Sequence, residues 1–87
     1  MLPVDLLQPL RQRPFVPFRI QVSDGSAYDV RHPELVMVGL GSVAIGIPAS
    51  GQPQPVYERI ETVSLGHVVK LIPLEIAKAT GDGQSGG

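Results

Sequence analysis

The residues that could do chemistry in this sequence are two histidines and a few oxygen groups near them. His32 and Glu34 flank Pro33, a spacing that could serve a metal ion or an acid–base pair. A metal site needs three or four converging ligands, and the chain offers one other histidine, His67. A strand that ends at His32 and a helical turn that starts at Glu34 explain the pair more simply. We therefore predict no metal site.

Ser64 lies shortly before His67, which raises the question of a hydroxyl nucleophile and its base. The sequence around Ser64 lacks the pattern of a nucleophile elbow, and His67 follows Gly66 ahead of an apolar run. A half-buried residue at the start of a strand is the simpler interpretation of His67. We predict no catalytic residue and no cofactor.

The other chemistry-bearing residues have structural explanations. Asp24 fits a turn, and Asp29 and Arg31 share one strand face, which predicts a solvated charge pair. The remaining candidates are Glu58 and Glu61 in a polar stretch, and the glycines of Gly39-Leu40-Gly41, which lack the dinucleotide-binding fingerprint and fit a tight turn.

Composition limits the classes of protein that the chain can belong to. The 87 residues are 43% hydrophobic and 17% charged, which suits one small folded domain, and no cysteine is present for a disulfide or thiolate site. No signal peptide or membrane-length apolar run is recognised, so a cytosolic protein is expected. Net charge is -1, and Arg11, Arg13 and Arg19 are nearly balanced by nearby aspartates, which disfavours nucleic acid binding.

The clearest structural signal is an alternating pattern on either side of Asp24-Gly25. Apolar and polar residues alternate over residues 18–23 and again over 26–31, which is the period of a half-buried strand. An Asp-Gly pair between two such runs favours a hairpin, because its turn residues take positive φ. We predict that Phe18 and Tyr28 belong to the core of this hairpin and do not form a base-stacking platform.

The rest of the chain predicts helical turns at the start and a series of short strands. The spacing of Leu6, Leu7 and Leu10 favours a helix over residues 3–12, which Pro9 should make irregular. Strands are expected over 35–40, 43–47, 56–63 and 68–72, with a bulge at Gly46 and a helical turn over 64–67. Residues 35–40 are apolar throughout, so that strand is expected to be covered on both faces. The domain should extend over 1–75, followed by a flexible tail over 76–87.

Several of these segments also match a known pattern. Pro14-Phe15-Val16-Pro17-Phe18-Arg19-Ile20, Asp24-Gly25, Tyr28-Asp29-Val30 and His32-Pro33-Glu34 occur in this order. The chain resembles a group of short uncharacterised bacterial proteins with a PFxPFxI…DGxxYxVxHPE core, over roughly residues 5–74. No activity is established for that group, so the resemblance implies a bacterial, cytosolic protein and no functional residue.

The expected fold is mostly β: a small bent antiparallel sheet or barrel of five to six strands, Sm-like or Src-homology-like, with a short N-terminal helix. We predict a non-enzymatic interaction module without a membrane partner that self-associates, most simply as a dimer. The interface is expected to come from residues 36–40 and 68–72 and the face of Leu6, Leu7 and Leu10. The alternative is an RNA-binding Sm-like barrel that would use Arg11, Arg13 and Arg19.

Overall fold

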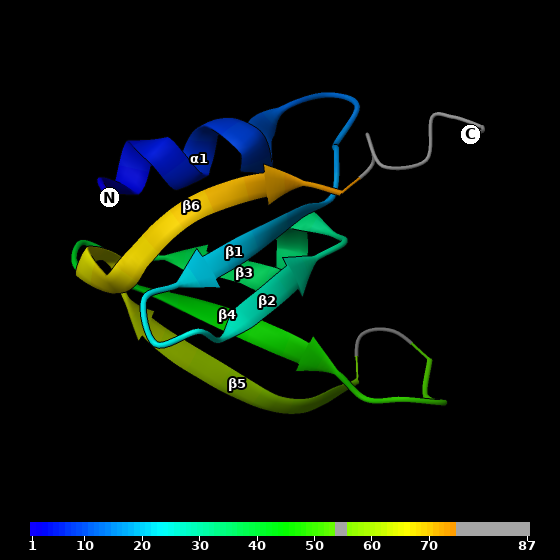
Figure 1. The fold of residues 1–87 in the computed structure, drawn as a ribbon. Helices are drawn as coiled ribbons and strands as arrows, with labels where there is room; N and C mark the ends of the chain where they lie inside the picture. Colours follow the sequence, from blue (N-terminus) through cyan, green and yellow to red (C-terminus); the bar gives the residue numbers. More distant parts are fainter. Residues whose placement is uncertain (54–55, 75–87) are drawn as a thin grey trace, which may run out of the picture.

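The computed structural model describes residues 1–53 and 56–74, and β structure dominates them (Figure 1). The strands form two three-stranded antiparallel sheets, in the orders β2-β1-β6 and β3-β4-β5. The prediction of a mostly β fold with a short N-terminal helix is therefore confirmed. In chain order the elements are α1 (Pro3–Arg11), β1 (Phe18–Val22), β2 (Ala27–Val30), the 3-10 turn η1 (Pro33–Leu35), β3 (Val36–Val38), β4 (Ser42–Pro48), β5 (Tyr57–Ser64), the 3-10 turn η2 (Leu65–His67) and β6 (Val68–Pro73).

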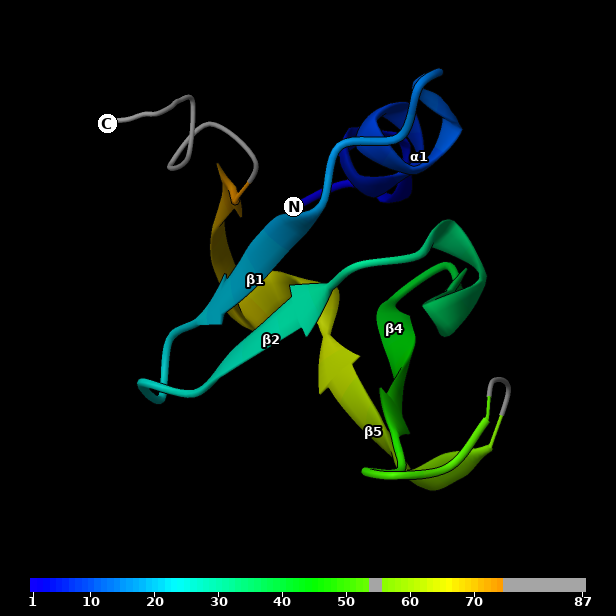
Figure 2. The ribbon, with the colours of Figure 1, turned by 90° about the vertical axis from the view of Figure 1, so that its right-hand side faces the viewer.

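The strands do not form the single five- to six-stranded sheet or closed barrel that the sequence suggested. β2 and β3 follow one another in the chain but belong to different sheets, which Figure 2 shows as separate layers. Pro33 begins η1 and has no N–H to donate, so backbone pairing cannot continue from β2 into β3. The third strand of the first sheet is β6 instead, which η2 brings back beside β1.

The predicted hairpin is confirmed. Phe18 lies opposite Val30 and Ile20 opposite Tyr28. The connection is a three-residue loop, because the Val22 N–H donates to the Ser26 carbonyl at 2.9 Å. Within the loop Gly25 has φ of 92°, a conformation that glycine adopts without a steric cost.

The core lies between the two sheets, and α1 contributes to it. Its fully buried side chains come from α1 and from both sheets: Leu6, Ile20, Val30, Val43 and Ile45. The helix is continuous despite Pro9, contrary to the irregular turns that we expected. Pro9 leaves the Asp5 carbonyl without its helical partner, but Asp5 is exposed, so water can satisfy that group.

Burial of the leucine face outweighs the cost of Pro9. Leu6 is fully buried and Leu10 nearly so, and each buried leucine stabilises the fold by about 1.5–3 kcal/mol. The Asp5 carboxylate also accepts the Leu2 N–H at 2.9 Å at the start of the helix. Leu6 and Leu10 of the leucine face that we considered for an interface therefore belong to the core.

Two further predictions concern membrane-spanning segments and the C-terminal tail. Among residues 1–53 and 56–74, no helix is long and apolar enough to cross a membrane. The tail predicted over 76–87 lies outside the described residues.

Candidate interaction surface

The outer face of the β3-β4-β5 sheet is apolar. Met37 lies opposite Ala44, and Gly46 lies opposite Ile60. Because Val43 is fully buried on the inner face, the residues that alternate with it point outward. Met37 is 76% exposed and Ile60 66% exposed. The expectation that residues 35–40 are covered on both faces is therefore wrong: the strand is covered on one face.

Tyr57 lies over this outer face because Gly46 makes room for its ring. A Cβ atom on Gly46 would lie 2.8 Å from Cε1 of Tyr57 and 2.9 Å from Cδ1. The bulge predicted at Gly46 falls one step later, where the register shifts between Ile47 and Pro48. Gly46 thus serves the packing of an aromatic ring and is not itself the bulge.

We define the outer apolar surface as Met37, Ala44, Gly46, Tyr57 and Ile60. Together with Glu34, Leu35 and Val36 these residues line a shallow hollow of ≈ 120 Å³. Small-molecule sites usually have volumes of about 300–1,000 Å³. The hollow is therefore too small for a typical ligand pocket, and the surface suits contact with another protein better.

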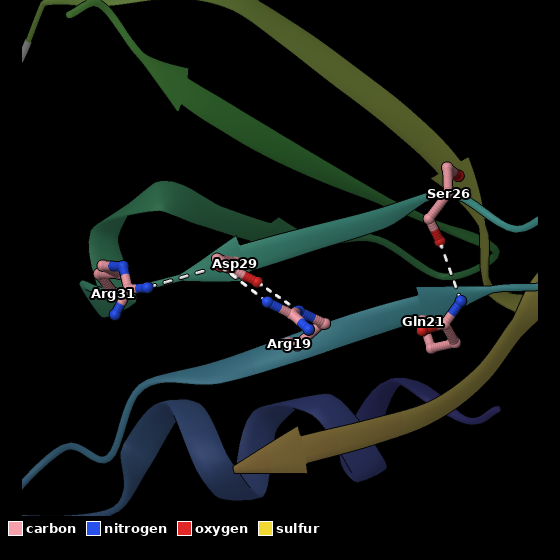
Figure 3. Close-up of polar contacts among 5 residues, drawn as sticks. All are labelled: Arg19, Gln21, Ser26, Asp29 and Arg31. Atoms are coloured by element: carbon pink, nitrogen blue, oxygen red, sulfur yellow. Dashed lines mark hydrogen bonds and ion pairs between the residues drawn. The ribbon is translucent and has the colours of Figure 1, made fainter. Parts of the chain in front are cut away.

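The polar face of the β1-β2 hairpin carries a paired ion cluster (Figure 3). Arg19 donates from Nε to Oδ1 of Asp29 at 2.7 Å and from Nη2 to Oδ2 at 3.3 Å. Nη2 of Arg31 lies 3.5 Å from Oδ2 of the same carboxylate. The hydrogen bond from Arg19 lowers the pKa of Asp29 below its ordinary value. The Asp29–Arg31 pair was predicted, but Arg19 is the closer partner because the hairpin register sets it opposite Asp29.

The arginines considered for RNA binding do not form a free basic patch. Arg19 is held by Asp29, and the guanidinium of Arg13 donates to the carbonyls of Leu10 and Gln12. Arg11 lies in the last turn of α1. A phosphate would have to compete with a carboxylate for Arg19, which weakens the electrostatic gain on binding.

A second ion cluster lies on β5. Arg59 donates from Nε to Oε2 of Glu61 at 2.6 Å and from Nη1 to Oε2 of Glu58 at 3.0 Å. The hydrogen bond to Glu61 raises the pKa of Arg59 above its ordinary value. Arg59 therefore pairs with both Glu58 and Glu61, the two carboxylates that we assigned to a polar stretch from the sequence.

The structure does not bring the candidate catalytic residues into a reacting arrangement. Oγ of Ser64 accepts the Gly66 N–H at 3.3 Å and so caps η2. The exposed His67 joins the hairpin loop through its backbone carbonyl, which accepts the Ser23 N–H at 2.8 Å. Asp24 accepts the Ser26 hydroxyl at 2.6 Å, and this bond lowers the pKa of Asp24.

The residues that we considered as metal ligands lie at the surface. His32 and Glu34 are exposed at the start of η1. Within the part of the chain that the structure describes, no three histidine, aspartate or glutamate side chains form a group that could hold a metal ion.

Three of the four aromatic side chains pack in or against the core. Phe18 is 3% exposed, and Phe15 packs against its ring edge-to-face with centroids 6.0 Å apart. Tyr28 is partly buried against the same cluster. Tyr57 is the exception, and we did not predict its role from the sequence. The available signal was Gly46, a glycine at an outward position of an otherwise regular strand.

Comparison of this chain with protein-family models, with curated proteins and with solved structures finds no match. The resemblance to the uncharacterised bacterial group therefore stays a prediction. Function has to be inferred from the chain's own surface.

Proposed function

We propose that this chain is a non-enzymatic interaction module that self-associates, most simply as a two-fold dimer, through the side of the molecule formed by the outer apolar surface and β5. The observation that carries the proposal is the exposure of Met37 and Ile60 on one face of a sheet. Contiguous apolar surface of this kind is typical of protein–protein contacts. The proposal places the protein in the bacterial cytosol, as the absence of cysteine and the family resemblance suggest.

Self-association is favoured over the RNA-binding alternative because arginines of this chain are paired with its own carboxylates. Arg19 and Arg59 each donate to a carboxylate of the same chain, and the net charge is -1. Nucleic acid affinity depends largely on free cations that neutralise phosphates. An exposed apolar side chain such as Ile60 gains free energy when a second copy covers it, without that requirement.

Sedimentation velocity across tens of micromolar tests the proposal, with Ile60→Lys as the variant. Ile60 is 66% exposed, so the lysine should leave the fold intact while placing a charge on the contact surface. We expect a wild-type dimer whose dissociation constant rises by more than about tenfold in the variant. A wild-type protein that stays monomeric over the whole range would overturn the proposal.

Val69→Lys is the matched control, because Val69 is 58% exposed but lies on β6 of the other sheet. We expect this variant to dimerise as the wild type does. If Val69→Lys dissociates the dimer and Ile60→Lys does not, the contact lies on β6, within the segment 68–72 that was also expected to contribute to the interface.

A further inference from the structure

β5 is the longest free sheet edge in the described chain. It is an outer strand of its sheet and has 8 residues, against 3 in β3 and 4 in β2. The fourth outer strand, β6, has 6 residues and ends at Pro73, which discourages pairing at an edge. The first four residues of β5 are all exposed. β5 is therefore the strand best placed to accept another strand.

Two backbone bonds show which groups of β5 point to its free edge. The Leu65 N–H donates to the Gly41 carbonyl at 3.0 Å, in the register that sets Ser42 opposite Ser64. Bonded and non-bonded pairs alternate along an antiparallel ladder. Every second residue counted back from Leu65 therefore bonds to β4 through its backbone N–H and C=O groups, and these residues include Glu61 and Arg59. The N–H and C=O groups of Thr62 and Ile60 consequently point away from β4, toward the open edge.

The charges of β5 are complementary to themselves about Ile60. When two copies of a strand pair antiparallel about a two-fold axis, the residue on the axis lies opposite itself. With Ile60 on the axis, Arg59 of one copy lies opposite Glu61 of the other, and the reverse contact forms as well. This pair falls at a non-hydrogen-bonded position, where facing side chains are closest.

Other registers fit less well. An axis at Glu58 sets two glutamates opposite each other. Axes at Arg59 or Glu61 also set two like charges opposite each other. An axis at Thr62 sets Ile60 opposite Ser64 and gives Arg59 no carboxylate partner. Like charges directly opposite each other destabilise a strand pair, so the Ile60 register is favoured.

We infer that two copies of this chain pair β5 with β5 in antiparallel fashion about Ile60, which joins their β3-β4-β5 sheets into one continuous sheet. This inference rests on the proposed function and specifies its geometry. Each Ile60 contacts its counterpart, and the two outer apolar surfaces become neighbours on one face. Arg59 and Glu61, which already pair within one chain at 2.6 Å, then alternate with those of the second copy in a closed set of four charges.

Single-cysteine variants test the register directly, because the chain has no cysteine of its own. Ile60→Cys should form a disulfide-linked dimer under mild oxidation, since facing Cα atoms on the axis are about 5.5 Å apart. In the matched variant Thr62→Cys, the two cysteines lie four positions apart along the paired strands, about 14 Å. Because this distance is beyond the reach of a disulfide, cross-linking should be slower by at least about tenfold.

The outcome separates this inference from the proposed function. If the wild type sediments as a dimer but Thr62→Cys cross-links as fast as Ile60→Cys, the register is wrong and self-association stands. If the wild type is monomeric, both are wrong.

Charge reversal gives an independent test. Arg59→Glu and Glu61→Arg should each weaken dimerisation by about tenfold, because each places like charges opposite each other. The double variant should restore it, and so should an equimolar mixture of the two single variants. Arg31→Glu makes the same change in net charge as Arg59→Glu, but away from β5, and should have little effect. Single variants that dimerise as the wild type does, or a mixture that fails to recover, would overturn the Ile60 register.

Discussion

Substitution of Gly46 by alanine tests the packing of Tyr57 against β4. The new methyl carbon would lie 2.8 Å from Cε1 of the ring, whereas non-bonded carbons are most favourable at about 3.5–4.0 Å. The ring must therefore move by at least about 0.7 Å (3.5 − 2.8) or rotate into solvent. Overpacking costs about 1–3 kcal/mol, and alanine recovers about 0.5–1 kcal/mol of backbone entropy. The difference is a net loss of about 0–2.5 kcal/mol. Because Tyr57 is 37% exposed, its ring can yield, so we expect a value below the middle of that range, about 1 kcal/mol.

The assay is a double-mutant cycle by urea unfolding with Gly46→Ala, Tyr57→Ala and both together. Gly46→Ala should destabilise the wild-type background and be neutral or stabilising once Tyr57 is removed. Gly41→Ala is the control, because a Cβ atom at Gly41 meets nothing within 4 Å, and its effect should stay within about 0.5 kcal/mol. Equal costs of Gly46→Ala in the two backgrounds would refute the assigned contact.

Three further expectations follow from the hairpin and the charges. Gly25→Val should lower the free energy of unfolding by more than about 1 kcal/mol, because Gly25 has φ of 92°; Gly25→Asn should cost less, and a neutral valine variant in thermal melts would remove the turn assignment. The pKa of Asp29 is lowered by Arg19, so its ionised form stabilises the fold above the unfolded pKa of about 3.9 and that contribution is lost as pH falls through the lower folded value. Asp29→Asn should therefore lower Tm at neutral pH and much less in strong acid; a Tm difference that does not change with pH would contradict this. Fluorescence anisotropy should detect no salt-sensitive RNA binding at physiological salt, and micromolar binding that is lost on replacing Arg11, Arg13 and Arg19 would favour the RNA-binding alternative.

Local features of the fold could be predicted from the sequence because their causes are local. The hairpin depends on alternation and on a glycine that can take positive φ, and both are visible in residues 18–31. The turn at η1 follows in the same way from Pro33.

The arrangement of the strands could not be predicted, because alternation does not specify a strand's partner. Nothing in residues 68–73 indicates that they pair with β1 and leave β5 at an open edge. Met37 was misjudged for a related reason. An apolar run predicts a strand that is buried on both faces, but the exposure of each residue depends on whether another element packs over its face. The outer apolar surface could therefore be located only in the folded chain.

The pairing of β1 with β6 has a consequence for how the chain folds. The pairs β1-β2, β3-β4 and β4-β5 each join strands that are adjacent in sequence, so their loops close at a small entropic cost. The β1-β6 pair instead sets Phe18 opposite Pro73. These strands are separated in sequence by the whole β3-β4-β5 sheet. Contacts between distant residues form slowly, because closure entropy is lost before the contacts are gained. Docking of β6 is therefore the expected kinetic barrier, and destabilising substitutions at its contact with β1 should slow folding, whereas those on β5 should mainly accelerate unfolding.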